Sequence, residues 1–285
     1  MKKILYISDF HLSELKFGGA EYNDKEVIDS LKKSGYDVSF INCRSVSADF
    51  LKKNYFDLKI ISNFLFLRKS LLEQIADEGD YILYEHDHKY LASRNPAFHT
   101  NFQAPKRKII NKKLYTNALR VICQSSFQEK IIKSNLELNN TFNVSGNLWS
   151  DEDLEKIKEL SKNKKTKSYS ILNCVMDSKN TNGTIKFCEN NDYNYELIED
   201  ENYYNFLEKI SKNKGLVFLP RSPETLSRIC VEAKMMGCTV ITNQLVGAKY
   251  EDWFKKSGDE IISEMRSVRK KVVDEIITAM SEKSE

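Results

Sequence analysis

The sequence has little glycine and proline and no long apolar run. Among its 285 residues are 10 glycines and 4 prolines, which excludes collagen-like and low-complexity architectures and predicts regular elements joined by short loops. No stretch approaches the ~18 apolar residues that a membrane-spanning helix needs. The net charge is only +3, which is too small to make nucleic acid the default partner, so any basic surface must be local.

The six cysteines form no CxxC motif, and most lie inside apolar runs such as RVICQS and RICVEA. This pattern predicts buried, reduced thiols and a cytoplasmic protein. The N-terminus MKKILYISDF does not fit a signal peptide, because its apolar run covers only Ile4 to Ile7 before Asp9 interrupts it. We interpret it as a first strand.

Short apolar runs alternate with amphipathic segments along the first half of the chain. Runs such as Ile4–Ser8 and Tyr81–Tyr84 lack polar alternation, and helical patterns such as those at 21–34 and 108–118 separate them. This alternation predicts a parallel sheet covered on both faces.

A polar stretch then interrupts the pattern, and the alternation restarts near Ser170. We therefore predict an α/β chain with two Rossmann-like βαβ domains facing a cleft and a C-terminal helical segment. The predicted parts are an N-terminal domain at 1–149, a polar linker or helix at 150–168, a C-terminal domain at 169–255, and a final helix at 256–285, whose return to the N-terminal domain is left open.

The segment from Leu216 to Asn243 carries the most chemical information. A strand ends at Pro220, Glu224 lies at the start of a helix expected over Thr225–Met236, and Glu232 follows two turns later. The N–H groups of the first helical turn form an anion site, and a carboxylate beside them accepts hydrogen bonds from sugar hydroxyls. A plain helix cap with Glu232 facing water has the same spacing, so the pattern alone leaves both interpretations open.

This segment resembles the Glu-x7-Glu signature of retaining nucleotide-sugar glycosyltransferases with the two-domain GT-B fold. The matching residues are Pro220, Glu224, Glu232 and the run MGCTVIT at 236–242. The resemblance implies that Glu224 contacts donor-sugar hydroxyls and that Glu232 contacts the nucleotide ribose. It also implies that the N–H groups of Thr225, Leu226 and Ser227 hold the diphosphate.

Two further motifs fit the same family in the expected order. Gly18 and Gly19 in FGGAE precede a helix, where glycines permit a positive φ and close approach of a ligand. His86 in YEHDH follows a strand, and the resemblance places it near the donor sugar. A simple turn and hydrogen-bonded structural histidines remain the alternatives for these motifs.

The phosphate-binding residues depart from the family pattern. Lys179 fits the position of the family lysine, but the arginine position falls near Asn173 or Cys174, so that arginine is missing. Arg221 or Arg228 is the candidate substitute. The resemblance implies sugar transfer from a nucleotide-diphosphate donor with retained anomeric configuration, Glu224, His86 and Lys179 being the catalytic candidates. It implies no metal and no other cofactor.

The acceptor is expected to be a cell-surface glycan or glycolipid, with the enzyme peripheral to a membrane. A basic segment at 105–120 is the candidate acceptor, membrane or nucleic-acid surface, with Ile109, Ile110 and Leu114 expected to pack inward. A solvated helix face is the alternative. The side chains expected to point outward are those of Lys106, Arg107, Lys108, Lys112 and Lys113.

Three other functions stay open. A phage-type DNA glycosyltransferase is one, because Lys- and Asn-rich stretches suggest an AT-rich genome. A non-catalytic nucleotide- or sugar-binding module is another, since the phosphate arginine is missing. A metallophosphoesterase is the third, because Asp9 and His11 form an Asp-x-His after the first strand.

Overall fold

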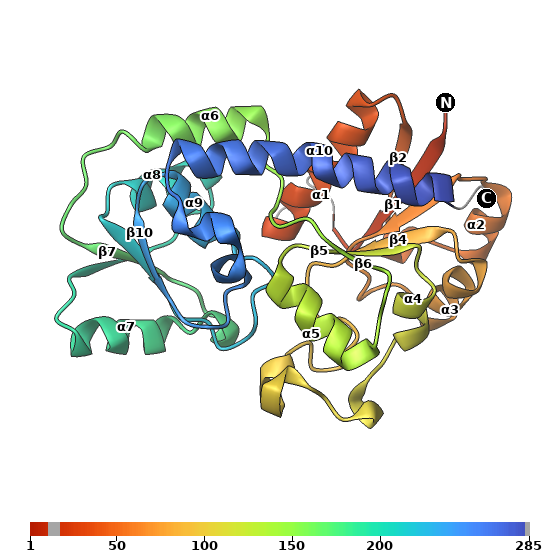
Figure 1. Cartoon of the computed structure of the whole chain (residues 1–285), viewed down its shortest axis with the longest axis horizontal. Coiled ribbons are helices and arrows are strands. Elements are labelled where there is room, and N and C mark those ends of the chain that lie inside the picture. The colour runs from red at the N-terminus through yellow and green to blue at the C-terminus, as the bar shows by residue number, and fades with distance from the viewer. Residues whose placement is uncertain (11–17, 283–285) are drawn as a thin grey trace. The chain divides into compact units, whose positions relative to one another are not determined.

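The computed structural model describes residues 1–10 and 18–282. The chain divides into two compact units. The first comprises Met1–Leu148 together with the chain from Ser267 onward, and the second comprises Trp149–Arg266. Helix α10 (Asp259–Glu282) contributes to both units, because the division falls inside it (Figure 1).

The first unit is built on a six-stranded sheet with the order β2-β1-β3-β4-β5-β6, in which every pairing is parallel. The order reverses between β1 and β3, which makes this pair the topological switch point of the sheet. The strands are β1 (Lys3–Ser8), β2 (Asp37–Asn42), β3 (Leu58–Ile61), β4 (Tyr81–Tyr84), β5 (Arg120–Cys123) and β6 (Thr141–Asn143).

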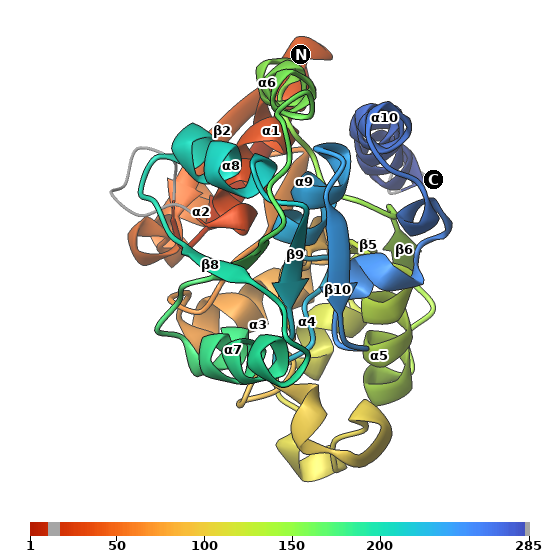
Figure 2. The ribbon, with the colours of Figure 1, turned by 90° about the vertical axis from the view of Figure 1, so that its left-hand side faces the viewer.

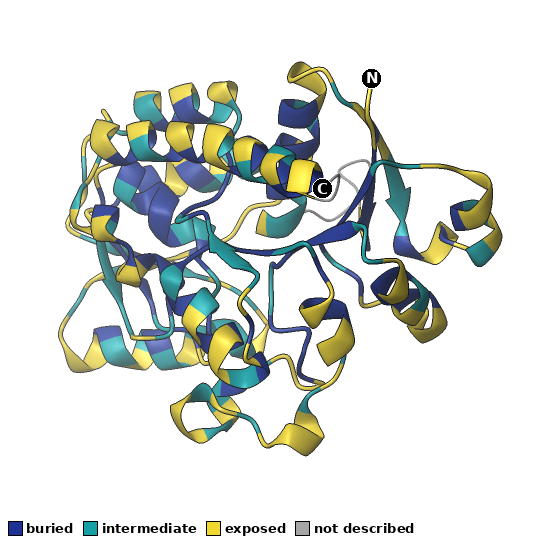
Figure 3. Cartoon of the chain, turned by 45° about the vertical axis from the view of Figure 1, so that its right-hand side comes forward, coloured by how far each residue is buried: buried dark blue, intermediate teal, exposed yellow. Residues whose placement is uncertain are grey.

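Helices cover this sheet because each of them buries one apolar stripe. In α3, for example, Leu71, Leu72 and Ile75 are buried, and Gly79 ends the helix with a φ of 76° that glycine adopts without strain. Figure 3 shows buried strands beside helices whose outer faces are exposed. The helices between the strands are α1 (Gly19–Lys33), α2 (Ala48–Lys53), α3 (Lys69–Glu78), α4 (Lys112–Thr116) and α5 (Ser126–Leu136).

The second unit holds a four-stranded parallel sheet with the order β10-β9-β7-β8, of which Figure 2 shows β8, β9 and β10. Its switch point lies between β7 and β9. The elements are α6 (Asp151–Leu160), β7 (Tyr169–Leu172), α7 (Thr181–Asn190), β8 (Tyr195–Ile198), α8 (Tyr203–Ser211), β9 (Gly215–Phe218), α9 (Arg228–Met235) and β10 (Thr239–Thr242).

The prediction of two Rossmann-like α/β units is confirmed. The polar stretch at 150–168 contains α6, whose N-terminus is capped by the Ser150 hydroxyl accepting the Asp153 N–H at 2.9 Å. Within the first unit, the end of α10 is bound to β5, because Arg120 pairs with Glu275 at 2.6 Å and with Glu282 at 2.7 Å. None of the described helices is both long and apolar enough to cross a bilayer.

The helix expected over 108–118 is wrong in its extent. A 3₁₀ turn at Lys106–Lys108 and the short helix α4 take its place. Between them Ile110 donates its N–H to the Tyr90 carbonyl at 2.8 Å, and Asn111 adopts a φ of 57° while its side chain donates to the Lys89 carbonyl. These bonds tie the chain to the segment after β4 and therefore stop helix propagation.

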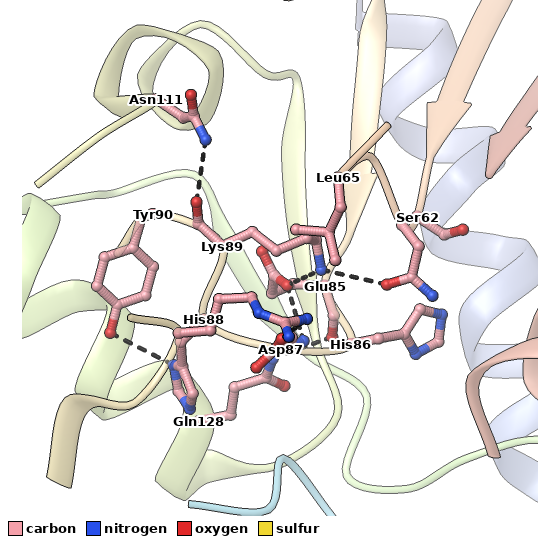
Figure 4. A network of polar contacts seen from close by, with 12 residues as sticks. Ser62, Leu65, Glu85, His86, Asp87, His88, Lys89, Tyr90, Asn111 and Gln128 are labelled. Atoms are coloured by element: carbon pink, nitrogen blue, oxygen red, sulfur yellow. Dashed lines mark hydrogen bonds and ion pairs between the residues drawn. The ribbon is translucent and has the colours of Figure 1, made fainter. Parts of the chain in front are cut away.

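A buried ion pair holds the segment that follows β4 (Figure 4). Glu85 and Lys89 are 1% and 2% exposed, and the Lys89 ammonium donates to the Glu85 carboxylate. The Tyr115 hydroxyl and the Asp87 N–H also donate to Glu85, the latter at 2.8 Å. Since a buried carboxylate needs donors, these bonds fix the position of Glu85 and of the segment around it.

Replacing Lys89 by Met should destabilise the protein by about 3–5 kcal/mol, because the Glu85 carboxylate then loses its buried counter-charge. Urea unfolding followed by circular dichroism measures this loss. Tryptophan fluorescence would not report on the first unit, because Trp149 and Trp253 both lie outside it. Lys53→Met, at an exposed position of α2, should change the free energy of unfolding by less than about 0.5 kcal/mol. Equal effects of the two variants would contradict the role of the pair.

His88 in the same segment is held neutral inside the first unit. It is 1% exposed, its Nδ1 lies 3.3 Å from the Tyr90 hydroxyl, and its Nε2 has no hydrogen-bond partner among the described residues. Burial, assisted by the charge of Lys89 and opposed by that of Asp87, lowers the pKa of His88 to about 4.

This shift predicts a loss of stability on acidification. Between pH 6.5 and about 4 the unfolded chain binds a proton that the folded chain does not, so the free energy of unfolding should fall as the pH falls through this window, by about 3 kcal/mol. His88→Phe should flatten that part of the stability profile, as measured by urea unfolding at successive pH values. His99→Phe, at a half-buried position, serves as the control. An unchanged slope in His88→Phe would refute the assignment.

Candidate functional site

The loops that leave β7, β9 and β10 are joined to one another at the carboxyl edge of the second sheet. Glu224 forms a parallel bridge with Val246, and its N–H donates to the Leu245 carbonyl at 2.8 Å. Arg221 donates its N–H to the Ser178 carbonyl, also at 2.8 Å. The backbone around Glu224 is therefore fixed by loops from both neighbouring strands.

Lys179 and Glu224 meet at the switch point of this sheet. Lys179 follows β7 and Glu224 follows β9, and the Lys179 Nζ lies 2.8 Å from the Glu224 Oε1. Burial lowers the pKa of Lys179, but the Glu224 carboxylate more than compensates and raises it overall. Two candidates chosen separately from the sequence thus form one ion pair.

Glu232 lies on α9 and is buried rather than facing water. Its Oε1 accepts hydrogen bonds from the Trp149 indole N–H at 3.0 Å and the Tyr203 hydroxyl at 2.8 Å. The Arg228 guanidinium lies 3.4 Å from the same oxygen and 4.1 Å from the Trp149 ring centroid. These partners converge on Oε1 and fix the carboxylate inside the second unit.

The expected helix start at Thr225 is wrong, because α9 begins at Arg228. Residues 224–226 pair with the loop after β10, where Ala248 donates its N–H to the Leu226 carbonyl at 3.0 Å. Ser227 then turns the chain with a φ of 80°, which is strained for a residue other than glycine. The N–H groups of Leu226 and Ser227, which make no hydrogen bond to the described residues, therefore precede the helix instead of forming its first turn.

The two arginines considered as substitutes for the missing one differ in their surroundings. Arg228 is held by Glu232 and Trp149. Arg221 is exposed and pairs with Asp177, whose side chain is also exposed. At the position of the missing arginine, Asn173 donates to the Glu199 carboxylate at 2.8 Å. Arg221 is therefore the more exposed of the two arginines, and its partner is an exposed carboxylate.

The glycine pair of the first unit does not adopt the positive φ that the sequence suggested. Gly18 precedes α1 with a φ of −114°, and its N–H donates to the Glu21 carboxylate at 2.7 Å. A Cβ at Gly18 would lie 2.8 Å from that carboxylate, which the flexible Glu21 side chain could relieve by moving. Gly19 is the first residue of α1, whereas Phe17 and His11 lie outside the described residues.

His86 belongs to a buried network centred on Asp24. Its Nε2 lies 2.6 Å from the Asp24 Oδ1, and its Nδ1 lies 2.7 Å from the Gln124 amide nitrogen. If that amide donates to Nδ1, the imidazole carries its proton on Nε2 and donates it to Asp24. Asp24 also accepts bonds from Tyr6 at 2.7 Å and from Ser62 at 2.6 Å. The contact between His86 and a donor sugar stays a prediction.

Sequence reasoning missed Asp24, although the sequence contains a signal for it. Asp24 lies on the same helical stripe as Val27, Ile28 and Leu31, which are all buried. A carboxylate on the apolar stripe of a helix needs buried donors and therefore marks a polar cluster inside the fold. Trp149 and Tyr203 have no such signal, because an aromatic residue among polar sequence neighbours does not by itself indicate a bond to a buried carboxylate.

The five basic residues predicted to point outward are exposed, although they do not share a helix. Lys112 and Lys113 pair with Glu137 and Asp77. Lys106, Arg107 and Lys108 have no carboxylate partner among the described residues. Leu114 packs inward as expected and Ile109 is half-buried, whereas Ile110 is 40% exposed.

Asp9, one residue of the Asp-x-His motif, is 1% exposed and already engaged. Its two carboxylate oxygens accept the N–H groups of Leu65 at 2.8 Å and Phe66 at 3.0 Å. Within residues 1–10 and 18–282, no three His, Cys, Asp or Glu side chains gather in a way that would hold a metal ion.

Comparison of the sequence with models of protein families and with curated proteins finds no match. Solved structures do match along almost the whole chain. Anabaena Alr3699/HepE in complex with UDP-glucose has a TM-score of 0.55 at 14% identity, covering 98% of this chain and 92% of its own. An alpha-glucosyltransferase in complex with UDP and a 13-mer DNA has a TM-score of 0.54 at 11% identity, covering 99% and 92%.

The catalytic domain of Starch Synthase IV from Arabidopsis thaliana, bound to ADP and acarbose, has a TM-score of 0.56 at 9% identity, with 99% of each chain covered. All three structures contain a nucleoside diphosphate or a nucleotide sugar. At these identities the similarity concerns the fold. The chain therefore has the GT-B fold of nucleotide-sugar glycosyltransferases, as the resemblance in its sequence implied.

Proposed function

We propose that this protein is a glycosyltransferase that moves a sugar from a nucleotide-diphosphate donor to an acceptor hydroxyl with retention of anomeric configuration. The observation that carries the proposal is the Lys179–Glu224 ion pair at the switch point of the second sheet. Ligands of open parallel sheets bind at such points. The fold it shares with structures containing UDP-glucose, UDP or ADP supports a nucleotide donor.

In this proposal the two residues of the pair act on opposite ends of the bond that breaks. The Glu224 carboxylate accepts hydrogen bonds from hydroxyls of the donor sugar. The Lys179 ammonium has three rotatable donors, so it can contact a phosphate oxygen without leaving Glu224. The positive charge near the leaving diphosphate then lowers the barrier, because negative charge develops there in the transition state.

Backbone groups complete the proposed diphosphate site. The N–H groups of Leu226 and Ser227, just before α9, are oriented by the bridge between Glu224 and Val246. Fixed N–H donors stabilise an anion without reorganising during the reaction. Arg221 adds a cation by exchanging Asp177 for phosphate. In this scheme the departing phosphate accepts the acceptor proton, and the nucleotide ribose contacts Glu232.

Glu224→Gln and Lys179→Met should each lower sugar transfer by about 10²-fold or more, because each removes charge that acts on the transition state. The measurement is release of nucleoside diphosphate from a panel of nucleotide sugars, with thermal shift reporting donor binding. Lys209→Met, which breaks an ion pair with Asp200 at 2.9 Å in the same unit, is the matched control. Wild-type turnover by Glu224→Gln would refute the site.

If no donor binds or turns over in the wild type, the protein is a non-catalytic module instead. Transfer that persists in EDTA agrees with a scheme in which Lys179 and backbone N–H groups supply the positive charge. Transfer that EDTA abolishes and divalent cation restores would overturn that part of the scheme.

DNA is a second candidate acceptor, beside a glycan or glycolipid. One structure of similar fold contains a 13-mer DNA, and Lys106, Arg107 and Lys108 provide exposed cations without carboxylate partners among the described residues. If DNA binds there, the triple variant with Gln at these positions should weaken binding and reduce the salt slope of log K by up to about 3. Fluorescence anisotropy with a short duplex at several salt concentrations measures this. A slope that the variant leaves unchanged would exclude the basic turn as a DNA contact.

A further inference from the structure

Several exposed apolar side chains of the first unit lie on connections that follow strands of its sheet. Large ones described as exposed in this unit are Met1, Phe10, Tyr55, Leu65, Phe66, Phe98 and Ile110. All of these except Met1 and Tyr55 lie on segments that leave β1, β3 or β4. Phe10, Leu65 and Phe66 follow directly after β1 and β3 and so share the carboxyl edge, where neighbouring exposed apolar groups indicate a binding surface.

Two of these side chains lie against an arginine, and a third is adjacent to one of them in sequence. The Phe10 and Phe66 rings pack edge to face with centroids 5.8 Å apart and are 37% and 42% exposed. The Arg44 guanidinium lies 3.5 Å from the Phe66 centroid and 5.9 Å from that of Phe10. Leu65, which is 50% exposed, precedes Phe66. We refer to Phe10, Arg44, Leu65 and Phe66 as the Arg44 cluster.

The topology of the sheet explains why this cluster forms. Arg44, Phe10 and Phe66 follow β2, β1 and β3, which are neighbours in the sheet. The Asp9 carboxylate accepts the N–H groups of Leu65 and Phe66 and so fixes the loop after β3. Asn42 links the other two loops, since its side chain donates to the Asp9 carbonyl at 2.6 Å and accepts the Arg44 N–H at 2.9 Å.

Two properties of the cluster point to a ligand. It lies beside the switch point between β1 and β3, where ligands of parallel sheets bind. Arg44 has no carboxylate partner among the residues that the structure describes, and its guanidinium is stacked on Phe66. A stacked guanidinium offers the donors on its edge to an anion while its flat face stays on the ring.

We propose that the Arg44 cluster binds the phosphate of a lipid-phosphate acceptor, with the apolar chain next to that phosphate lying against Phe10, Leu65 and Phe66. The proposal rests on the glycosyltransferase function above and names the acceptor class for it. The cluster combines an anion-binding head with exposed apolar side chains, which is the chemistry of a phosphate joined to a hydrocarbon chain.

A nucleic acid fits the cluster less well. Nucleobases bind through aromatic faces, and the Arg44 guanidinium already covers one face of Phe66 while Phe10 packs against it edge to face. The cluster therefore suits a phosphate with an apolar chain better than a stacked base.

Co-sedimentation with phosphatidylcholine vesicles that contain phosphatidic acid tests the proposal. Wild-type protein should bind them, and Arg44→Gln should weaken binding about tenfold, which equals one lost charge-assisted hydrogen bond. Arg44→Lys should restore only part of the affinity, because an ammonium lacks the planar fork that stacks on a ring and holds phosphate through two fixed donors. Phe66→Ala should weaken binding as well.

Matched controls separate the cluster from general surface effects. Lys53→Gln removes one exposed charge from α2, and Tyr55→Ala removes an exposed aromatic ring outside the cluster, so both should bind vesicles like the wild type. Inorganic phosphate should compete only at far higher concentration than the vesicles, since it lacks the chain. If it competes equally well, the cluster binds free phosphate and the lipid assignment fails.

Two results would overturn the proposal. The first is equal vesicle binding by the wild type and Arg44→Gln. The second is that Arg44→Gln weakens the binding of single-stranded DNA more than it weakens the binding of vesicles. Donor turnover without acceptor is measured in parallel. If Arg44→Gln retains donor hydrolysis but vesicle binding is absent in the wild type, this inference fails alone; if the wild type neither binds nor hydrolyses any donor, the proposed function fails first.

Discussion

Parallel pairing of the strands is the constraint on which the rest of this molecule depends. In a parallel sheet every strand ends at the same edge, so loops that are distant in sequence meet there. Lys179 and Glu224 are 45 residues apart and yet form an ion pair, because β7 and β9 are neighbours. The same rule brings Phe10, Arg44 and Phe66 together beyond β1, β2 and β3.

Buried charges make these loops rigid. A carboxylate loses its hydration when it is buried, so hydrogen-bond donors must replace the lost water. Asp9, Asp24, Glu85 and Glu232 each meet this condition with partners from other segments. Since each partner is itself held by the fold, the side chains at the sheet edges are positioned in advance. Such preorganisation is what a site needs in order to stabilise developing charge.

The sequence was sufficient to predict the fold class, because apolar runs and amphipathic helices of this kind have few other arrangements. It also identified Lys179 and Glu224 as separate candidates. Their pairing depends on the order of strands in the sheet, which the local periodicity of the sequence does not reveal. The helix expected at 108–118 failed for a related reason, since Ile110 and Asn111 bond to the segment after β4, far away in sequence.

The partners of Glu232 could not be predicted from local sequence patterns either. Trp149 and Tyr203 precede it by 83 and 29 residues, and nothing in their own neighbourhoods indicates a polar role. Asp24 was the exception, because a carboxylate among Val27, Ile28 and Leu31 is itself a signal. Local patterns therefore reveal which residues are out of place, whereas tertiary contacts decide what each of them touches.

The spacing of Glu224 and Glu232 illustrates the difference between a local sequence pattern and the tertiary contacts that the residues make. Eight residues of continuous helix would place the two carboxylates about two turns apart on the same element. Here the backbone of Glu224 bridges Val246, Ser227 turns the chain at a positive φ, and only then does α9 begin. One carboxylate consequently faces Lys179 and the other faces Trp149 and Tyr203. The strained turn thus separates the two glutamates into different surroundings, and a change that let the helix extend back to Thr225 would break the bridge that holds Glu224 against Lys179.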